Sequence, residues 1–580
     1  MHDLMPLTKR QCCHWLPIGI VLVWLLFILP LYLPNMGGGG LKLPQNIIAW
    51  GVMAAVITTI WLSIPTNKTL RFTTASRWIM LAVPVLAIPL FYTIPEWRDM
   101  AFACWLALVG GAVFYLSLLQ YAALHRWLPW LLYGILAAAA LQAGIALLQF
   151  ITPDAVPGWL AYPRLNGRPY GVFQQVNVLA SFIATGLALA LVLSLLPGFS
   201  MLGKQAERAR QCALGLLLLL FPALLVWLQS RIGWLGGGVS GGLLLLLGWK
   251  TARARTFVAA GIIMMSISFA FVFQLNGNIA DVEHTGSNHA RLTMLSTTLD
   301  MITEQPWQGW GYGGFEYSFQ HYRLAQGLST QGLGVVTHPH NELLLWWAEG
   351  GVVALIGMLI LIYAGAKLVW RVCRPARHAS QQQVALAQAL SCVLLPILLH
   401  TQTEYPFSLS TAHWTIFLLL LAQLDRLTCG VTERRSLSAP TSALLSGMIP
   451  ALSIAILLLA GCGLYANLAL TTVERNHLAD IEPARAAMKY DLWVNSERWR
   501  YDQQTHALLA FNQTRDPALL DGYARWAQGY LSHRVDNNVY ASWLAIAQYQ
   551  QDAITHSRLR QEAHSLFPDD TRFLTPFIPQ

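Results

Sequence analysis

Long apolar runs separated by short polar gaps recur along the chain from Trp15 to Ala466. The pattern predicts an all-α, polytopic membrane protein with about thirteen transmembrane helices (roughly 12–14), because about 20 apolar residues are needed to cross a bilayer as a helix. The predicted spans are 15–34, 45–63, 78–95, 99–118, 127–150, 176–197, 212–229, 232–249, 256–273, 343–370, 384–402, 411–425 and 442–466.

The composition agrees with a membrane protein. Of the 580 residues, 55% are hydrophobic and 11% are charged, whereas about 25% are charged in an ordinary soluble domain. The first run follows Lys9 and Arg10, as in a secretory signal, but further spans follow and a small-residue cleavage site does not. It is therefore predicted to be an uncleaved first span. None of the eight cysteines falls in a segment placed firmly outside, so the sequence predicts no disulfide framework and no zinc site.

The distribution of Lys and Arg predicts the orientation. An odd number of spans puts the two termini on opposite sides of the membrane. With the N-terminus in the cytoplasm, most of the basic residues between spans fall on the cytoplasmic side, as the positive-inside rule requires. This bias explains much of the net charge of +9, so no nucleic-acid partner is predicted.

Three regions are then predicted to lie outside: the loop 151–175, the long loop 274–342 and the tail from residue 471. Two domains follow, a transmembrane domain over 1–470 and a C-terminal helical domain over 471–580. Aromatic, Leu and Ala positions recur at helical spacing in ALLDGYARWAQGYL and YASWLAIAQYQQDAI of the tail. Asp516 before Pro517 has the pattern of a helix N-cap followed by a proline at the first helical position.

Several arginines lie on the side that the positive-inside rule disfavours. A single arginine at the end of a span usually anchors it at the interface, with its charged head in water. Several together indicate an anion site, because the planar guanidinium binds phosphate oxygens in pairs and stays charged. The candidates for binding a diphosphate near the membrane surface are Arg164, Arg168, Arg231 and Arg291.

Two histidines precede the span that begins near residue 343. His338 and His340 stand beside Asn341 and Glu342 at the mouth of this span. Each alone is more often structural than catalytic. An imidazole, whose ordinary pKa is about 6.5, can accept a proton from a hydroxyl at neutral pH, so the pair is a candidate base for activating an acceptor oxygen.

Two glycine patterns receive structural interpretations. Gly309, Gly311 and Gly314 match the GxGxxG spacing of dinucleotide sites, but no strand precedes them, and a loop of turns is expected. The glycines at 236–238, 241 and 242 indicate close packing between membrane helices.

Five motifs, in order along about 150–425, resemble the bacterial superfamily of O-antigen ligases, Wzy-type polymerases and PglL-type protein O-oligosaccharyltransferases. They are GVFQQVNVLA, SRIGWLGG, ARLTMLSTTLDMITEQPWQGWGYGGF, HPHNELLLWWAEGG and TEYPF at 403–407. The resemblance implies a multi-pass enzyme of the inner membrane, with its active site in the periplasm. Such an enzyme moves a glycan from undecaprenyl diphosphate to a hydroxyl, without a metal, a cofactor or a nucleotide-sugar donor.

The resemblance also implies roles for residues. The essential histidine of the family corresponds to His340, and its arginines to Arg231 and Arg291. Its Q-x-N segment corresponds to Gln175 and Asn177, and its E-x-P segment to Glu404. His340, or His338 in its place, would activate the acceptor, and the arginines would stabilise the charge growing on the lipid diphosphate. Asn341, Arg164 and Arg168 are further candidates for substrate binding.

The acceptor remains open at this point. A tail such as 471–580 is typical of the protein ligases, which favours Ser or Thr of a pilin or another exported protein. Lipid A core and a growing glycan are the alternatives. A transporter or lipid flippase is a different class, which usually needs ionisable groups deep in its spans. The predicted spans contain few of these, and Glu349 and His400 lie toward the outer third.

Overall fold

The structure, a computed structural model, describes residues 15–63, 69–152, 168–279, 285–375, 379–429, 433–435 and 438–574. Contacts between Cα atoms divide the chain into two compact units. Unit 1 comprises residues 1–79, 110–282 and 362–468, and unit 2 comprises residues 80–109, 283–361 and 469–580. The predicted boundary between residues 470 and 471 as a division into functional domains stays a prediction.

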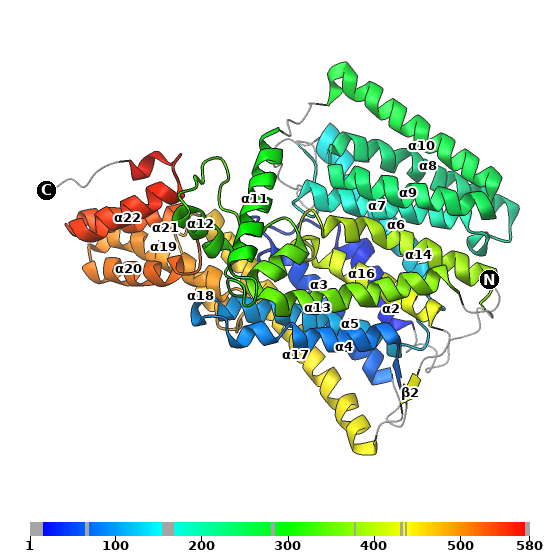
Figure 1. The fold of residues 1–580 in the computed structure, drawn as a ribbon, viewed down its shortest axis with the longest axis horizontal. Helices are drawn as coiled ribbons and strands as arrows, with labels where there is room; N and C mark the ends of the chain where they lie inside the picture. The colour runs from blue at the N-terminus through cyan, green and yellow to red at the C-terminus, as the bar shows by residue number, and fades with distance from the viewer. Residues whose placement is uncertain are drawn as a thin grey trace. The chain divides into compact units, whose positions relative to one another are not determined.

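Unit 1 is built mainly of long apolar helices. Its elements are α2 (Leu16–Val23), η1 (Trp24–Ile28), η2 (Gly40–Lys42), α3 (Pro44–Ser63), β1 (Leu70–Phe72), α6 (Leu128–Ile151), α7 (Val176–Leu195), η5 (Pro197–Phe199), α8 (Lys204–Leu228), α9 (Arg231–Thr251), α10 (Arg253–Phe273), η6 (Gln274–Asn278), α14 (Gln381–His400), α15 (Pro406–Leu409), α16 (Thr411–Thr428) and β2 (Glu433–Arg435). Strands β1 and β2 pair antiparallel in a short ribbon. Helices α7, α8, α9 and α10 lie side by side (Figure 1).

Unit 2 contains shorter helices, and four helices belong to both units. The elements of unit 2 are η3 (Ile88–Phe91), η4 (Pro95–Trp97), α11 (Thr285–Glu304), α12 (Phe315–Ala325), α18 (Glu482–Met488), α19 (Ser496–Thr514), α20 (Pro517–Leu531), α21 (Asn537–Tyr549), α22 (Ala553–Leu566) and η7 (Thr571–Phe573). The shared helices are α4 (Thr74–Val85), α5 (Arg98–Gln120), α13 (Glu342–Cys373) and α17 (Ala439–Arg475).

The prediction of an all-α, polytopic membrane protein is confirmed. Within the described residues, 11 helices are long and apolar enough to cross a membrane, and each corresponds to a predicted span. The two other predicted spans are also helical. The first forms the shorter apolar stretch Leu16–Ile28, and 411–425 forms α16. The count of thirteen stays a prediction.

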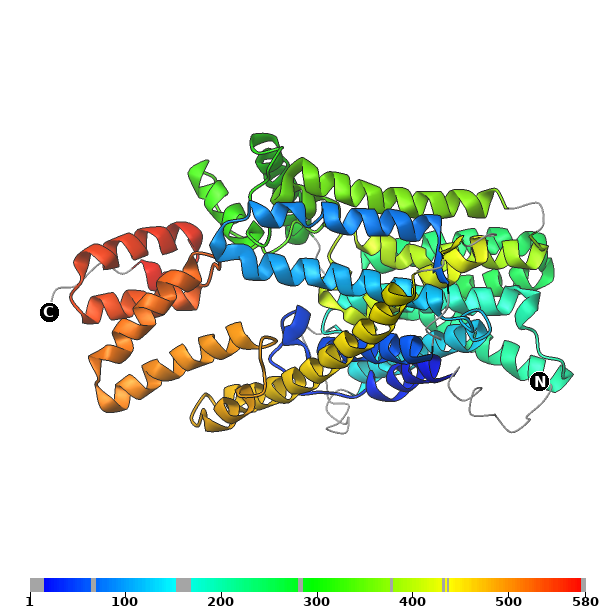
Figure 2. The same cartoon turned by 90° about the horizontal axis from the view of Figure 1, so that it is seen from below.

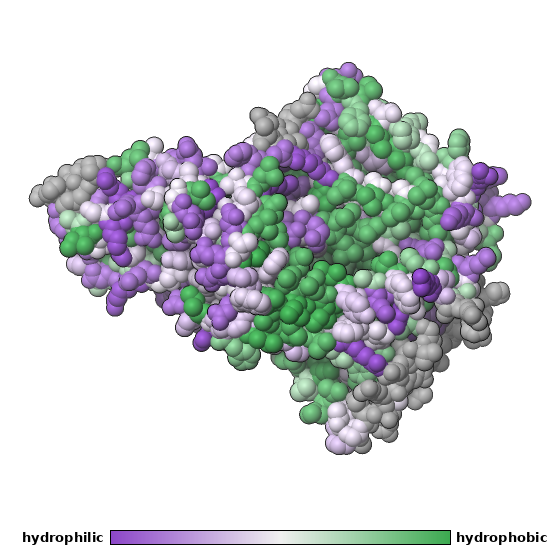
Figure 3. Space-filling view, viewed as in Figure 1, coloured by the Kyte–Doolittle hydropathy of each residue, from purple (hydrophilic) through white to green (hydrophobic). Residues whose placement is uncertain are grey.

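Burial separates core helices from helices that face lipid. Every residue in the apolar window of α7 is buried, as expected for a helix that is hydrophobic on all sides. In α17 only 11% of the window is buried, and residues such as Leu458 and Tyr465 are exposed. Helix α13 is similar, and its exposed residues form a hydrophobic patch in Figure 3. Apolar surface of this kind needs lipid rather than water around it.

Close packing at α9 follows from its glycines. A Cβ atom at Gly236 would lie 3.0 Å from the Cα atom of Pro396 in α14, and one at Gly237 would lie 3.0 Å from Leu225 in α8. The interpretation as packing glycines is therefore confirmed at these two positions. It is wrong for Gly238 and Gly242, where an added Cβ would meet nothing within 4 Å.

Helix α13 is broken near its start. Gly351 has φ 61° and ψ −156°, which is not helical and which only glycine adopts readily. The break frees backbone groups, and the preceding loop bonds them. The N–H of Val352 donates to the carbonyl of Pro306 at 2.9 Å, and the N–H of Trp310 donates to the carbonyl of Ala348 at 2.8 Å. The loop and the first turns of α13 thus form one continuous backbone network.

The remaining helices of unit 2 include one expected group and one unexpected pair. Helices were predicted in the tail, and α19–α22, orange to red in Figure 2, pack against one another in sequence order. The carboxylate of Asp516 accepts a hydrogen bond from the N–H of Ala518, which confirms the predicted N-cap of α20. Helices α11 and α12 lie in the segment predicted only as a long loop. The turns around Gly309 and Gly311 have positive φ, as expected.

Candidate active site

Two parallel helices of unit 1 begin side by side, and side chains cap both. The Gln175 Oε1 atom accepts from the N–H of Val178 at the start of α7. The Ser230 Oγ atom accepts from the N–H of Gly233 at the start of α9. The Ser230 hydroxyl also donates to the Asn177 Oδ1 atom at 2.7 Å, which joins the two helix starts. The positive ends of two helix dipoles therefore face the same region.

The carboxylate of Glu404 lies at these helix starts. Its Oε2 atom accepts from the Gln175 Nε2 atom at 2.8 Å, and its Oε1 atom accepts from the Asn177 Nδ2 atom at 2.6 Å. The His400 Nε2 atom donates to Oε2 at 3.1 Å. The structure thus brings the predicted residues Gln175, Asn177 and Glu404 together. Because Glu404 is only 2% exposed, these bonds are what makes its buried charge tolerable.

The environment of Glu404 keeps it ionised. Burial by itself raises the pKa of its carboxyl group, but the hydrogen bond and electrostatic attraction of His400 and the amide bonds from Gln175 and Asn177 lower it more. The resulting pKa is about 2, below the ordinary 4.5. Glu404 is therefore a fixed anion that holds the start of α7 against the end of α14, and not a proton carrier near neutral pH.

Sequence reasoning missed the inner part of this cluster. The Ser181 hydroxyl lies 2.9 Å from the His400 Nδ1 atom and 3.2 Å from the His413 Nε2 atom. The His413 Nδ1 atom lies 3.0 Å from the Ser410 hydroxyl. Ser181, His400 and His413 are fully buried. The available signal was polar residues inside otherwise apolar spans, which usually mark function.

The predicted arginines of unit 1 lie near the turn between α8 and α9. Arg231 is the first residue of α9 and is exposed. The Arg168 guanidinium is half-buried, and its Nη1 atom lies 3.5 Å from the carbonyl of Leu228, the last residue of α8. Arg164 lies outside the described residues. An arginine at the first position of a helix adds its charge to the helix N-terminus, an arrangement that attracts anions.

In unit 2 the two histidines are linked to each other. The N–H of His340 donates to the Nδ1 atom of His338 at 2.9 Å, and the ring planes are nearly perpendicular, at 83°. His340 has φ 56°, a left-handed conformation that residues other than glycine adopt infrequently. His338 is buried and His340 is half-buried. The His338 ring therefore supports the unusual backbone that presents His340, and backbone strain of this kind clusters at functional sites.

The two other predicted residues of unit 2 lie on helices. The Asn341 Oδ1 atom accepts from the N–H of Leu344 at 3.0 Å, so this side chain caps the start of α13. Arg291 is half-buried in the second turn of α11. Its placement on a helix was not predicted, because this segment was read as loop. His340 and its neighbours lie in unit 2, whereas Gln175, Asn177 and Glu404 lie in unit 1.

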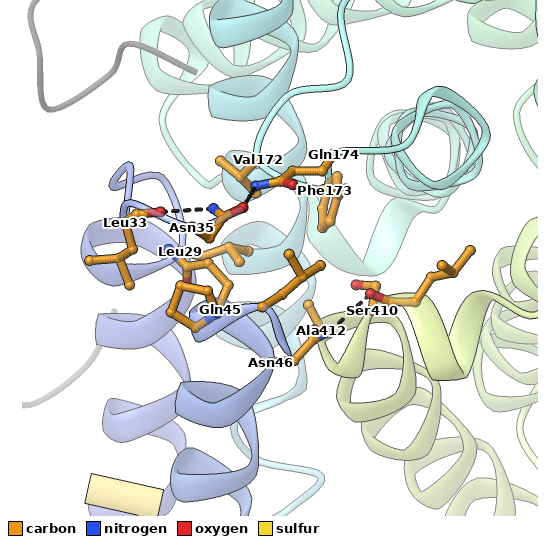
Figure 4. A pocket seen from close by; sticks show the side chains of 13 residues that line it. Leu29, Leu33, Asn35, Gln45, Asn46, Val172, Phe173, Gln174, Ser410 and Ala412 are labelled. Carbon is orange, nitrogen blue, oxygen red and sulfur yellow. Dashed lines mark hydrogen bonds between the residues drawn. The ribbon is translucent and has the colours of Figure 1, made fainter. Parts of the chain in front are cut away.

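A small cavity of unit 1 lies beside the residues that precede α7 and α16 (Figure 4). Asn35, Gln45, Asn46, Gln174 and Ser410 contribute its polar groups, and the Gln174 amide donates to the Asn35 Oδ1 atom at 2.6 Å. Its volume of about 20 Å³ is space for about one water molecule. It is therefore too small to hold a sugar or a diphosphate.

Three parts of the chain match known protein families. Residues 215–359 match the family described as O-antigen ligase. Residues 388–576 match the family described as virulence factor membrane-bound polymerase, C-terminal. Residues 169–193 match the family described as protein glycosylation ligase. The first match contains Arg231, Arg291, His338 and His340, and the last contains Gln175 and Asn177.

A relative carries the same assignment. A general O-oligosaccharyltransferase from Acinetobacter baylyi is 25% identical over 342 residues, which cover 54% of this chain and 53% of the relative. The chain thus spans about half the length of this relative. The resemblance read from the motifs is confirmed: parts of the chain match the families of O-antigen ligases and protein glycosylation ligases. It is a multi-pass membrane protein related to enzymes that transfer glycans.

Proposed function

We propose that this protein transfers a preassembled glycan from undecaprenyl diphosphate to Ser or Thr hydroxyls of exported proteins, at the periplasmic face of the bacterial inner membrane. The observation that carries the proposal is which residues lie within the O-antigen ligase match. Residues 215–359 contain Arg231 and Arg291, which the distribution of charges predicts on the disfavoured side of the membrane, and the His338–His340 pair. The left-handed backbone of His340 supports a functional role for this pair.

The proposed reaction is a single displacement. An imidazole nitrogen of His340 accepts the proton of the acceptor hydroxyl as its oxygen attacks the anomeric carbon of the glycan. The new carbon–oxygen bond forms while the bond to the phosphate oxygen breaks, so the anomeric centre inverts. Arg231 and Arg291 stabilise the negative charge that grows on the leaving diphosphate, which is a large source of catalysis in such reactions. The proposal requires no metal and no cofactor.

Two matches favour a protein as acceptor. The segment with Gln175 and Asn177 matches the protein glycosylation ligases, and the Acinetobacter relative is named as an O-oligosaccharyltransferase. Lipid A core remains the second candidate, because the family of residues 215–359 is named for O-antigen ligases. Glycan polymerisation is the third, because residues 388–576 match a polymerase family.

One experiment separates these acceptors. The purified full-length protein is reconstituted with undecaprenyl-diphosphate glycan and one acceptor at a time: a pilin, lipid A core or a second molecule of donor. Each reaction is run with and without a chelator. We expect a pilin that gains the mass of the glycan, at the same rate with and without chelator. Glycan gained by lipid A core alone, or a lengthened lipid-linked glycan alone, would assign the protein to ligation or polymerisation instead.

The two arginines provide a test of diphosphate binding. We expect Arg231→Lys and Arg291→Lys each to lower kcat/KM by roughly tenfold to hundredfold, because lysine keeps the charge but loses the paired N–H donors of the guanidinium. Alanine at either position should cost more. The rates are measured by transfer to the pilin. Arg323→Lys is the matched control, since this arginine binds Thr297 and the carbonyl of Ser329 within unit 2. Full activity of both lysine variants would contradict the proposed role.

A further inference from the structure

The connection between α18 and α19 is a rigid loop. The Asp491 side chain is buried, and its Oδ1 atom accepts from the N–H groups of Trp493 and Val494 at 2.9 and 2.7 Å. Its Oδ2 atom accepts from the backbone and side chain of Asn495 at 3.0 and 2.5 Å. Four hydrogen bonds to one carboxylate hold the loop in a single conformation.

This rigid loop presents large apolar side chains outward. Leu492 is 83% exposed, Tyr490 is 63% exposed and Trp493 is 39% exposed. Lys489, next to them, is also exposed. A loop that is held open with a leucine at its tip keeps apolar surface in water, which is unfavourable unless another phase or partner covers it. Tyrosine and tryptophan beside a basic residue are the residues that gather at membrane–water interfaces.

Contacts with the end of α17 indicate at which height along this helix the loop lies. The Arg498 Nη2 atom donates to the Thr471 Oγ1 atom at 2.8 Å and to a Glu474 carboxylate oxygen at 2.5 Å. Further along α19, the His506 Nδ1 atom lies 3.0 Å from the carbonyl of Leu478. Helix α19 therefore begins beside residues 471–474 and runs away from the apolar part of α17. The loop that precedes α19 lies on the side of the membrane.

The apolar surface of α17 ends close to that level. Tyr465 is 57% exposed, and the predicted span ends at Ala466. Thr471 follows Ala466 by about 8 Å along the helix axis, at 1.5 Å per residue. The headgroup region of a bilayer is about 5–8 Å deep on each side. Because the loop lies on the membrane side of residues 471–474, its tip falls within the depth of the headgroup region.

We propose that residues 489–493 form a membrane-contact loop, which inserts Tyr490, Leu492 and Trp493 into the headgroup region of the leaflet where α17 emerges. Lys489 contacts anionic lipid headgroups there. The proposal assigns the loop a lipid partner, independent of the glycan reaction. It predicts that the first part of the C-terminal segment rests on the bilayer, whereas the exposed residues of α22 are in water.

A fluorescent label tests this assignment. A full-length variant without its native cysteines carries Leu492→Cys, and a matched variant carries Ile554→Cys at a site in the same unit that is 85% exposed. Both are labelled with an environment-sensitive fluorophore in vesicles of phosphatidylethanolamine and phosphatidylglycerol. We expect blue-shifted emission at 492, and a ratio of quenching by spin-labelled lipid to quenching by iodide that is several-fold higher than at 554. Equal ratios at the two sites would overturn the proposal.

Two further measurements distinguish lipid from other binding partners and test the loop in a protein without substitutions. Protection of residue 492 that appears only at high protein density, or only after a pilin is added, would assign the loop to a second copy or to an acceptor. The unmodified protein is also exposed to a photoactivatable phospholipid, and adducts are expected on the peptide with residues 490–493 but not on the peptide around Ile554. The reverse pattern would contradict the proposal. None of these measurements needs glycan transfer, so they stand apart from the proposed function.

Discussion

His340→Ala is expected to lower the rate of glycan transfer by about 10²–10⁴-fold, the usual contribution of a general base. The reason is that no other group would take the proton from the acceptor hydroxyl. The rate is measured with purified protein at saturating donor and acceptor. Donor binding should change little, because the proposed contacts with the diphosphate come from the arginines. An unchanged rate would remove His340 from the reaction.

Two asparagine variants separate chemistry from backbone support. His340→Asn should be as inactive as the alanine variant yet fold normally, since asparagine tolerates the left-handed backbone of this position. His338→Asn should keep most activity, because the asparagine oxygen can replace the Nδ1 atom that accepts from the N–H of His340. His338→Ala should be roughly tenfold to hundredfold slower, as expected when one buried hydrogen bond worth about 1–3 kcal/mol is lost. If both His338 variants are as inactive as His340→Ala, His338 is itself the base.

Glu404→Ala is expected to lower the free energy of unfolding by about 3–5 kcal/mol, the largest loss among the site variants. The reason is that the buried donors of Glu404 then have no acceptor. Three donors from Gln175, Asn177 and His400 now converge on this carboxylate. Thermal unfolding in detergent measures the effect. Transfer per folded molecule should also fall, since Glu404 fixes the Asn177 side chain that accepts from Ser230, the residue before Arg231. A melting temperature equal to that of the unmodified protein would contradict this account.

A matched variant and a comparison at two pH values make the test of Glu404 more specific. Asp425→Asn removes another buried carboxylate of unit 1, which accepts from Thr73 and Tyr115 at 2.5 Å. It should reduce stability without reducing transfer per folded molecule. The pKa of Glu404 is about 2, against 4.5 ordinarily. Because the folded pKa is the lower one, its stabilisation is complete above about pH 4.5 and is lost only as the pH falls toward 2. Glu404→Ala should therefore have the same effect at pH 6 and pH 8.

The length of the apolar runs was sufficient to predict the membrane helices. Apolar runs near 20 residues long have few alternatives to a spanning helix, because lipid leaves no other partner for the backbone. Helices α11 and α12 were missed for the opposite reason. They are polar helices in a segment whose glycines and prolines suggested only turns, and tertiary contacts rather than hydrophobic runs define them.

Pairing between distant residues could not be predicted. The resemblance marked Gln175, Asn177 and Glu404 as candidates, but the hydrogen bonds to Glu404 join positions more than 220 residues apart in sequence. His400 and His413 lie in two different predicted spans, and only helix packing brings both to Ser181. The roles of His340, Arg231 and Arg291 stay predictions, which the variants above address.

The broken start of α13 limits how related enzymes can be recombined. Because the backbone of residues 306–311 is bonded into the break at Gly351, this loop is not an exchangeable cassette. A graft that takes the loop from a relative but keeps the host helix would place a foreign chain against Gly351, where an added Cβ atom would lie 2.2 Å from the Trp307 carbonyl oxygen. Chimeras that aim to exchange acceptor preference should therefore move residues 283–361 as one block.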